Sequence, residues 1–541
     1  MCSSITRATG AWALTRARKR KPPAGSNDKH RIPGASNTCR SARRNNRLIH
    51  AAIPTARRHA AATPSGSIGA ARSARRGTSA LRALGALGLL GVVTTVFLLS
   101  AGAARRPTQY VPGRSGGWPD WMAGPLRGLG VGISSGSFQN LMLIMSVSYL
   151  LVLLAARTLP LRALVAAIVA ANVILLLGPP LLSQDVFGYI SFARLGALHG
   201  LDPYTHVAAE VPTDPVFGFV GWPFLHSPYG PLFTLASYAT APLGLAGALW
   251  TFKAIAVASS LGTVALVVRA AGRLGQSRRW AAAFVGLNPV LLVLAVGGAH
   301  NDTLILLLLA GALALTAGAD PRFRAAAIAL VTGVAIKITA GLALPFLVLA
   351  PARAHERRQV VATACLGLVA LVAVGLVGFG THALSFLDAV GEQQQLVATH
   401  SVPAELARLV GLSGTPNWWR HLFIVAFVAV LAFALWRTTR GADWRIAAGW
   451  TTLALLLSTA WLLPWYATWL LPLAAVGGDR RLRAATLIFC AYAILIHLPL
   501  ADPLLSPPSA VHSHTVVLTS GHGLELSRFK IPGYSTLDLR W

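Results

Sequence analysis

A carboxylate follows a pair of prolines at the end of a long apolar stretch. The stretch 161–182 contains Pro179 and Pro180, and Asp185 comes shortly after it. Because prolines interrupt helical hydrogen bonding, we expect the helix to end there and Asp185 to lie just outside it. A carboxylate in that position can act as a general base and take a proton from an attacking hydroxyl group. Capping of the following helix is the structural alternative.

More polar groups follow Asp185 along the chain. From 186 to 199 apolar and polar residues alternate in a pattern typical of a helix that lies in a membrane interface. The turn after it returns a second carboxylate, Asp202, and the phenol of Tyr204 to the surface. Together with Tyr189 of the interfacial helix, these residues are candidates for binding substrate hydroxyl groups.

A rigid turn built from Pro228, Gly230 and Pro231 begins the next apolar segment. It holds His226 and Tyr229 at the membrane surface. Anchoring in an aromatic belt explains Tyr229 without any binding function. The same anchoring does not explain His226, so both residues stay candidates for substrate binding.

The run His300, Asn301 and Asp302 joins two apolar stretches. Polar side chains at such a place are costly unless they face a cavity or a ligand. Capping of the next helix needs one such residue and not three in a row. The run therefore favours a functional site.

Lys337 is a lone cation between two short apolar stretches. Its side chain either extends to the membrane interface or pairs with an anionic group such as a phosphate, and both readings remain open. Trp465 and Tyr466 end a further apolar stretch, where aromatic residues serve as interface anchors or as stacking surfaces for sugars. Glu392 and His400 are weaker candidates in a loop.

The elements that position these residues are apolar helices. Hydrophobic residues make up 54% of the 541 residues and charged residues 12%, against about 25% charged residues in soluble domains. This composition indicates an all-α polytopic membrane protein in contact with the lipid bilayer. Because a crossing needs about 20 apolar residues, we expect about thirteen transmembrane helices. They are expected near 81–103, 138–156, 161–182, 253–269, 281–298, 303–318, 325–338, 340–352, 359–379, 421–437, 445–462, 466–477 and 484–499.

The N-terminal segment 1–79 carries 17 of the 47 Lys and Arg residues and a single acid, Asp28. Its composition predicts a disordered basic cytoplasmic tail. Nucleic-acid binding is the alternative for such a charge, but no nucleic acid partner is expected. The apolar stretch 81–103 is too long for a cleaved signal. We therefore expect a transmembrane domain over 80–500 and an extracytoplasmic tail over 501–541.

The distribution of charge favours one orientation. With the N-terminus inside, basic clusters such as Arg269–Arg279 fall in short inner loops, provided that 229–250 does not cross the membrane. Twelve of the seventeen acidic residues then lie outside. The longest loops, which often carry function, lie outside as well: 104–137, 183–228 and 380–420. We expect the active site on the extracytoplasmic face of the plasma membrane.

Several common motifs are missing. The sequence has no P-loop, no GxGxxG and no HExxH, so a cytoplasmic nucleotide-sugar donor, ATP-driven transport and a bound cofactor are not expected. Its four cysteines lack the spacing of metal ligands.

The order of the polar motifs resembles the GT-C superfamily of polyprenyl-phosphate-sugar-dependent glycosyltransferases. Within it, the chain is most similar to the actinobacterial alpha-(1→6)-mannopyranosyltransferases of lipomannan synthesis. The resemblance covers residues 80–500 and rests on these motifs: Asp185-Val186-Phe187-Gly188-Tyr189, Gly200-Leu201-Asp202-Pro203-Tyr204, Ser227-Pro228-Tyr229-Gly230-Pro231-Leu232, Asn288-Pro289 with Gly297-Gly298-Ala299-His300-Asn301-Asp302, and Pro464-Trp465-Tyr466.

The resemblance implies a GT-C-like helical bundle with membrane-interface helices in an outer loop, and Asp185 as the catalytic acid/base residue. Members often have a second acid beside that aspartate. Here the neighbours are Gln184 and Val186. A metal-binding pair is therefore absent, and no metal is predicted.

The expected reaction is inverting transfer of a hexose, foremost mannose, from a polyprenyl-phosphate donor to a mannan or glycolipid acceptor of the cell envelope, with an alpha-(1→6) link. Asp185 is expected to deprotonate the acceptor. Lys337 and His300, with His226 as second choice, are expected to stabilise the leaving phosphate. The residues expected to orient hydroxyl groups are Asp202, Tyr204, Asn301 and Asp302.

Other classes remain open at this point. A transporter or flippase of lipid-linked sugars is expected to carry polar residues within its spans, whereas here the charged groups cluster at helix ends. A non-catalytic partner of an envelope synthase is a second alternative. The same chemistry with arabinose or glucose is the nearest one.

Overall fold

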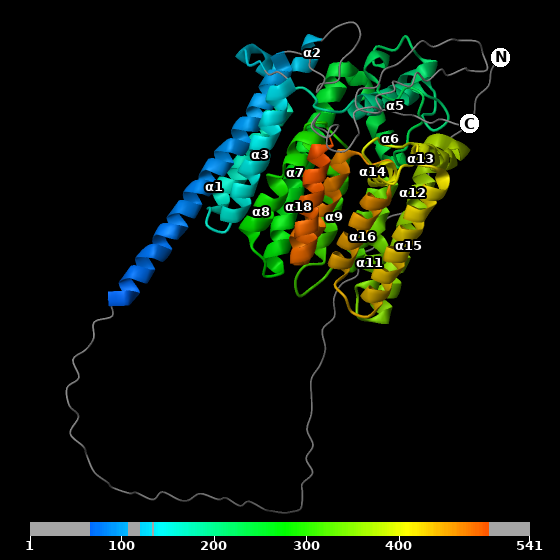
Figure 1. Ribbon diagram of the computed structural model, residues 1–541. Coiled ribbons are helices and arrows are strands. Elements are labelled where there is room, and N and C mark those ends of the chain that lie inside the picture. The colour runs from blue at the N-terminus through cyan, green and yellow to red at the C-terminus, as the bar shows by residue number, and fades with distance from the viewer. Residues whose placement is uncertain (1–64, 106–118, 133–134, 497–541) are drawn as a thin grey trace, which may run out of the picture. The chain divides into compact units, whose positions relative to one another are not determined.

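The structure is a computed structural model that describes residues 65–105, 119–132 and 135–496. Within these ranges the chain forms helices and contains no strand (Figure 1), which confirms the all-α prediction for this part. Most of both predicted tails lies outside the described residues. Helix α1 (Ser65–Arg105) begins within the stretch 1–79, for which the composition predicts a tail.

Among the residues that the structure describes, five helical segments are long and apolar enough to cross a membrane. They are Gly77–Arg105, Ser137–Ala155, Pro231–Arg273, Ala354–Gln395 and Asn417–Thr439. The pair α8 (Arg278–Gly286) and η5 (Val290–Val296), bent by 43°, makes a sixth if it is one span. The chain is therefore a membrane protein, but the predicted count of thirteen spans is not confirmed.

The other predicted spans form shorter helices. Helix α9 (Asp302–Leu315), for example, has 14 residues, whereas a full crossing needs about 20. Prolines and glycines break the longer apolar stretches, as Pro289 does between α8 and η5. The stretch 229–250 forms α6 (Pro231–Tyr238), η4 (Ala241–Leu243) and the start of α7 (Gly244–Arg273), and it belongs to a single candidate span with α7.

The remaining helical elements are α2 (Asp120–Ala123), η1 (Pro125–Leu129), α3 (Ser135–Ala155), α4 (Leu161–Leu177), α5 (Asp185–His199), η2 (Ala208–Glu210), η3 (Phe217–Phe219), α10 (Phe323–Val334), η6 (Ile338–Ala343), α11 (Leu344–Leu349), α12 (Ala354–Phe379), η7 (Gly380–Ser385), α13 (Phe386–Gln395), α14 (Val402–Leu409), α15 (Asn417–Thr439), α16 (Trp444–Ser458), η8 (Pro464–Trp469), α17 (Leu470–Gly477) and α18 (Arg480–Leu495).

The best-buried element is η5, a short π-helix in which every residue is buried. It packs against η8 and α7, and α7 in turn packs along α9. Because η5 has no exposed side, it fixes the loop 297–301 that follows it. Short π-helical segments often occur at functional sites, and this one leads directly into the polar run between η5 and α9.

Candidate active site

Two loops meet where the polar motifs come together. The loop 178–184 joins α4 to α5, and the loop 297–301 joins η5 to α9. The amide of Leu181 donates a hydrogen bond to the carbonyl of Gly297 at 2.9 Å. This bond holds the two loops side by side although they lie far apart in the sequence.

Each loop contains a residue with an unusual backbone conformation. Leu182 has a φ of 63° and Ala299 a φ of 55°. The left-handed region is unfavourable for residues with a side chain, at a cost of about 1–3 kcal/mol each. These two positions come shortly before Asp185 and His300, so the surrounding packing sustains backbone strain beside both of these residues.

The central contact of the site joins Asp185 to His300. Oδ2 of Asp185 lies 3.3 Å from Nδ1 of His300. The Asp185 side chain is 13% exposed, whereas that of His300 is fully buried. The indole of Trp465 stacks on the imidazole with ring centroids 3.8 Å apart. Capping does not explain Asp185, because Gln184 occupies the N-cap position of α5.

A second charged pair joins Lys337 to Asp302. The Lys337 Nζ lies 3.2 Å from Oδ1 of Asp302, whose side chain is 1% exposed. Trp469 donates from Nε1 to the same oxygen at 2.7 Å. The ammonium also lies 4.5 Å from the centre of the Tyr466 ring. Lys337 is therefore held by a buried carboxylate and aromatic rings, and does not extend alone to the interface.

Tyr189 links α5 to the start of α9. Its hydroxyl donates to Oδ1 of Asn301 at 3.3 Å, and its ring meets the Tyr229 ring edge-on at 5.0 Å between centroids. The Tyr204 hydroxyl donates to the carbonyl of Tyr229 at 2.8 Å. Asn301 occupies the N-cap position of α9, but its side chain makes no capping hydrogen bond. These four residues are partners of one another next to the two charged pairs.

Asp202 and His226 belong to a separate group. Oδ2 of Asp202 lies 3.4 Å from Nδ1 of His382, and Nδ1 of His226 lies 3.1 Å from Oε2 of Glu392. The hydrogen bond to Glu392 raises the pKa of His226 against the opposing effect of burial. Within the described ranges, neither Asp202 nor His226 forms a hydrogen bond or ion pair with Asp185. Asp202 connects the loop 200–230 to η7, and His226 connects it to α13.

The far end of α5 is anchored by Asp214, which is buried. Its carboxylate lies 2.9 Å from Nε of Arg194 and 2.7 Å from Nε2 of His199. Burial alone would raise the pKa of Asp214, but the hydrogen bonds from Arg194 and His199 outweigh that effect and hold the pKa below its usual range. This cluster fixes the helix that begins at Asp185.

Lys253 is a residue that the motif analysis misses. It lies in α7, is 1% exposed, and donates from Nζ to the carbonyl of Pro179 at 3.4 Å, in the loop that precedes Asp185. In the sequence, Lys253 is a single ionisable residue inside an apolar stretch. Such a residue within a membrane span suggests a functional site. Because the predicted span 253–269 begins at this lysine, the residue looks like a span boundary.

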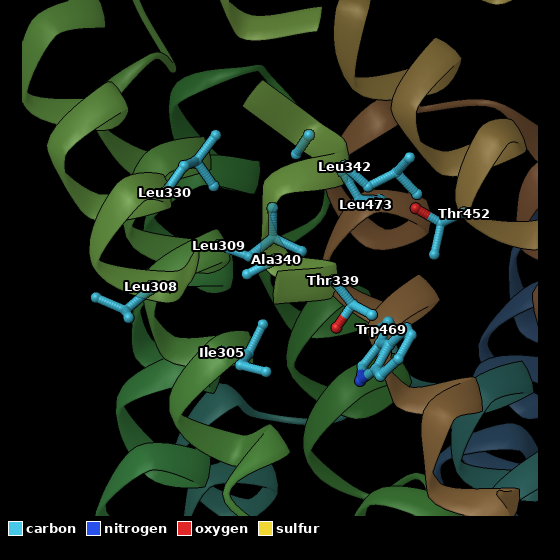
Figure 2. A pocket seen from close by; sticks show the side chains of 12 residues that line it. Ile305, Leu308, Leu309, Leu330, Thr339, Ala340, Leu342, Thr452, Trp469 and Leu473 are labelled. Carbon is cyan, nitrogen blue, oxygen red and sulfur yellow. The ribbon is translucent and has the colours of Figure 1, made fainter. Parts of the chain in front are cut away.

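An apolar pocket lies beside the Lys337–Asp302 pair. Figure 2 shows it between side chains of α9, α10, η6 and α17, with the Trp469 ring at one side. Other lining residues include Ile305, Leu330, Ala340 and Leu473. Because Trp469 also donates to Asp302, the pocket and the charged pair share one residue.

Comparison with known proteins identifies the class of this site. Residues 82–353 match the family described as alpha-(1→6)-mannopyranosyltransferase, N-terminal domain, and residues 406–520 match the MptB C-terminal domain. The chain is therefore a membrane-bound glycosyltransferase. No solved structure matches it significantly.

Two curated relatives agree with this class. The chain is 30% identical over 356 residues to alpha-(1→6)-mannopyranosyltransferase A of Mycobacterium tuberculosis, which covers 60% of this chain and 67% of the relative. It is 31% identical over 181 residues to the protein of the same name from Corynebacterium glutamicum, covering 32% of this chain and 36% of that relative. The chain belongs to the alpha-(1→6)-mannopyranosyltransferase family, which confirms the resemblance found in the motifs.

Proposed function

We propose that the chain transfers a mannosyl group from a polyprenyl-phosphate donor to a hydroxyl group of a mannan or glycolipid acceptor, with an alpha-(1→6) link. The names of the two relatives support the sugar and the link. The lipid-linked donor is supported by Trp469, which lines the apolar pocket and donates to the carboxylate that pairs with Lys337. An apolar pocket suits a prenyl chain, and an adjacent cation suits its phosphate.

In this mechanism Asp185 is the general base. It accepts the proton of the acceptor hydroxyl group as the oxygen attacks the anomeric carbon. The bond from that carbon to the phosphate oxygen breaks, and its electron pair leaves with the phosphate. Lys337 stabilises the charge on the leaving group. A single displacement inverts the anomeric carbon and requires one base on the acceptor side.

We also propose that this site faces the outside of the plasma membrane, with the N-terminus in the cytoplasm. Arginine-rich loops group together away from the site: Arg279 donates to the carbonyl of Arg157, and Arg483 donates to Gln276. Short basic loops are typical of the cytoplasmic face.

The orientation can be tested by cysteine labelling in intact cells, in a chain that lacks its four native cysteines. A membrane-impermeant maleimide is expected to label Asp120→Cys, whose side chain is 81% exposed, and not Arg440→Cys in a basic loop. Labelling of Arg440→Cys alone would show the reverse orientation.

Filling the apolar pocket tests the lipid-linked donor. Ala340→Phe places a ring where we propose the prenyl chain to lie, and is expected to raise the KM for polyprenyl-phosphate mannose by about tenfold or more, the equivalent of about 1.4 kcal/mol of lost binding. Leu366→Phe is the matched control, because Leu366 is 71% exposed on α12. An unchanged KM in a folded Ala340→Phe protein would remove this pocket as the site of the lipid chain.

A further inference from the structure

Protein surrounds the His300 ring on the face that stacks on Trp465 and on the edge beside Gly298. The stack on Trp465 has 3.8 Å between centroids, and the His300 side chain is fully buried. A Cβ atom added at Gly298 would lie 2.6 Å from both Cδ2 and Nε2 of His300. The edge of the imidazole that carries Nε2 therefore lies directly against Gly298, where any side chain would displace it.

Only the opposite nitrogen of His300 faces a charged group. Nδ1 lies at ion-pair distance, 3.3 Å, from Oδ2 of Asp185. Among the described residues neither Nδ1 nor Nε2 has a partner that meets the geometry of a hydrogen bond. The tautomer of a histidine is set by the partner of its ring nitrogens. A carboxylate beside Nδ1 favours a proton on that nitrogen.

Access to substrate differs between the two side chains. The Asp185 side chain is partly exposed, and that of His300 is not exposed at all. A phosphate or a sugar can approach the carboxylate without touching the ring.

From these contacts we infer that His300 is a positioning residue, which holds an N–H at Nδ1 within ion-pair distance of Asp185 and so orients that carboxylate toward the acceptor, while Gly298 and Trp465 hold the ring in place. The inference rests on the proposed function, in which Asp185 is the base. It replaces the expectation that His300 stabilises the leaving phosphate, and leaves that role to Lys337.

Two substitutions separate the polar contact with Asp185 from the packing of the ring. His300→Asn keeps an N–H donor near the position of Nδ1 but loses the stack on Trp465. His300→Phe keeps the stack and loses the donor. We expect His300→Phe to lower kcat by about 100-fold, the order of loss that follows misplacement of a reacting group, with the donor KM unchanged. We expect His300→Asn to retain a kcat within about tenfold of the wild type.

The values of kcat and donor KM of both variants, measured with polyprenyl-phosphate mannose and a mannoside acceptor, test the role of His300. The reverse ranking, with His300→Phe active and His300→Asn inactive, would assign His300 to packing. An increase in donor KM without a change in kcat in both variants would place His300 against the donor. Either result would overturn the inference. Absence of transfer by the wild type would instead count against the proposed function, so the two failures are distinguishable.

Gly298→Ala provides an independent test that leaves His300 and Asp185 chemically unchanged. Its Cβ is expected to displace the imidazole and to lower kcat without changing the donor KM. Gly311→Ala in α9 is the control, because a Cβ there meets only Leu266 at 4.0 Å. Melting temperatures of the purified variants identify any that fail to fold. A folded Gly298→Ala protein with wild-type kcat would contradict the positioning role.

Discussion

Asp185→Asn is expected to reduce mannosyl transfer by about 100-fold or more, since general base catalysis contributes about 10²–10⁴-fold. The amide has nearly the shape of the carboxylate but cannot accept the proton of the acceptor hydroxyl group. Asp185 is partly exposed and is not the N-cap residue of α5, so the substitution is expected to leave the fold intact. Transfer of radiolabelled mannose to a short mannoside, at equal protein abundance, measures the effect.

A matched control is Asp388→Asn, which makes the same chemical change at an exposed position in α13. It is expected to keep wild-type transfer. Retention of full activity by Asp185→Asn would remove Asp185 as the base. Loss of transfer by Asp185→Asn alone would also argue against a transporter and against a non-catalytic partner, because neither class needs a proton acceptor at this carboxylate.

The second large effect is expected for Lys337→Met. The substitution removes the cation that we propose to stabilise the leaving phosphate, and loss of one such electrostatic contact typically costs about 100–1,000-fold in kcat. It also leaves Asp302 as a buried carboxylate without its ammonium partner, which destabilises a protein by about 3–5 kcal/mol. A lower melting temperature and lower transfer are therefore both expected for the single variant.

The double variant Lys337→Met with Asp302→Asn separates the two effects. A neutral amide at 302 removes the unpaired buried charge, so the melting temperature is expected to recover. Transfer is expected to stay low, because the cation is still missing. Recovery of transfer together with stability would show that Lys337 serves the fold and not the reaction.

Local features of the site could be predicted from the sequence. The helix that begins at Asp185 and ends before Gly200 follows from the proline pair and from glycine, which takes φ 67° at residue 200. The polar run from His300 to Asp302 stands out because such residues are rare between apolar stretches. These signals depend on neighbours in the sequence, which is why they could be read without the structure.

The pairing of these residues could not be predicted in the same way. Asp185 with His300 and Lys337 with Asp302 are contacts between separate elements, and they depend on how α5, η5 and η6 pack. Trp465 is a further example, since its position suggests an interface anchor or a sugar platform, whereas its ring stacks on His300. The number of spans could not be predicted for a related reason: hydropathy does not reveal where Pro289 and similar residues divide an apolar stretch.

The central claim is that the sugar comes from a lipid-linked phosphate, and a direct comparison of donors tests it. Purified protein is supplied with radiolabelled mannose either as polyprenyl-phosphate mannose or as GDP-mannose, together with a short mannoside acceptor. The proposed mechanism predicts transfer from polyprenyl-phosphate mannose and none from the nucleotide sugar. Transfer from GDP-mannose alone would contradict it, and would leave the apolar pocket beside Lys337 without the role proposed for it.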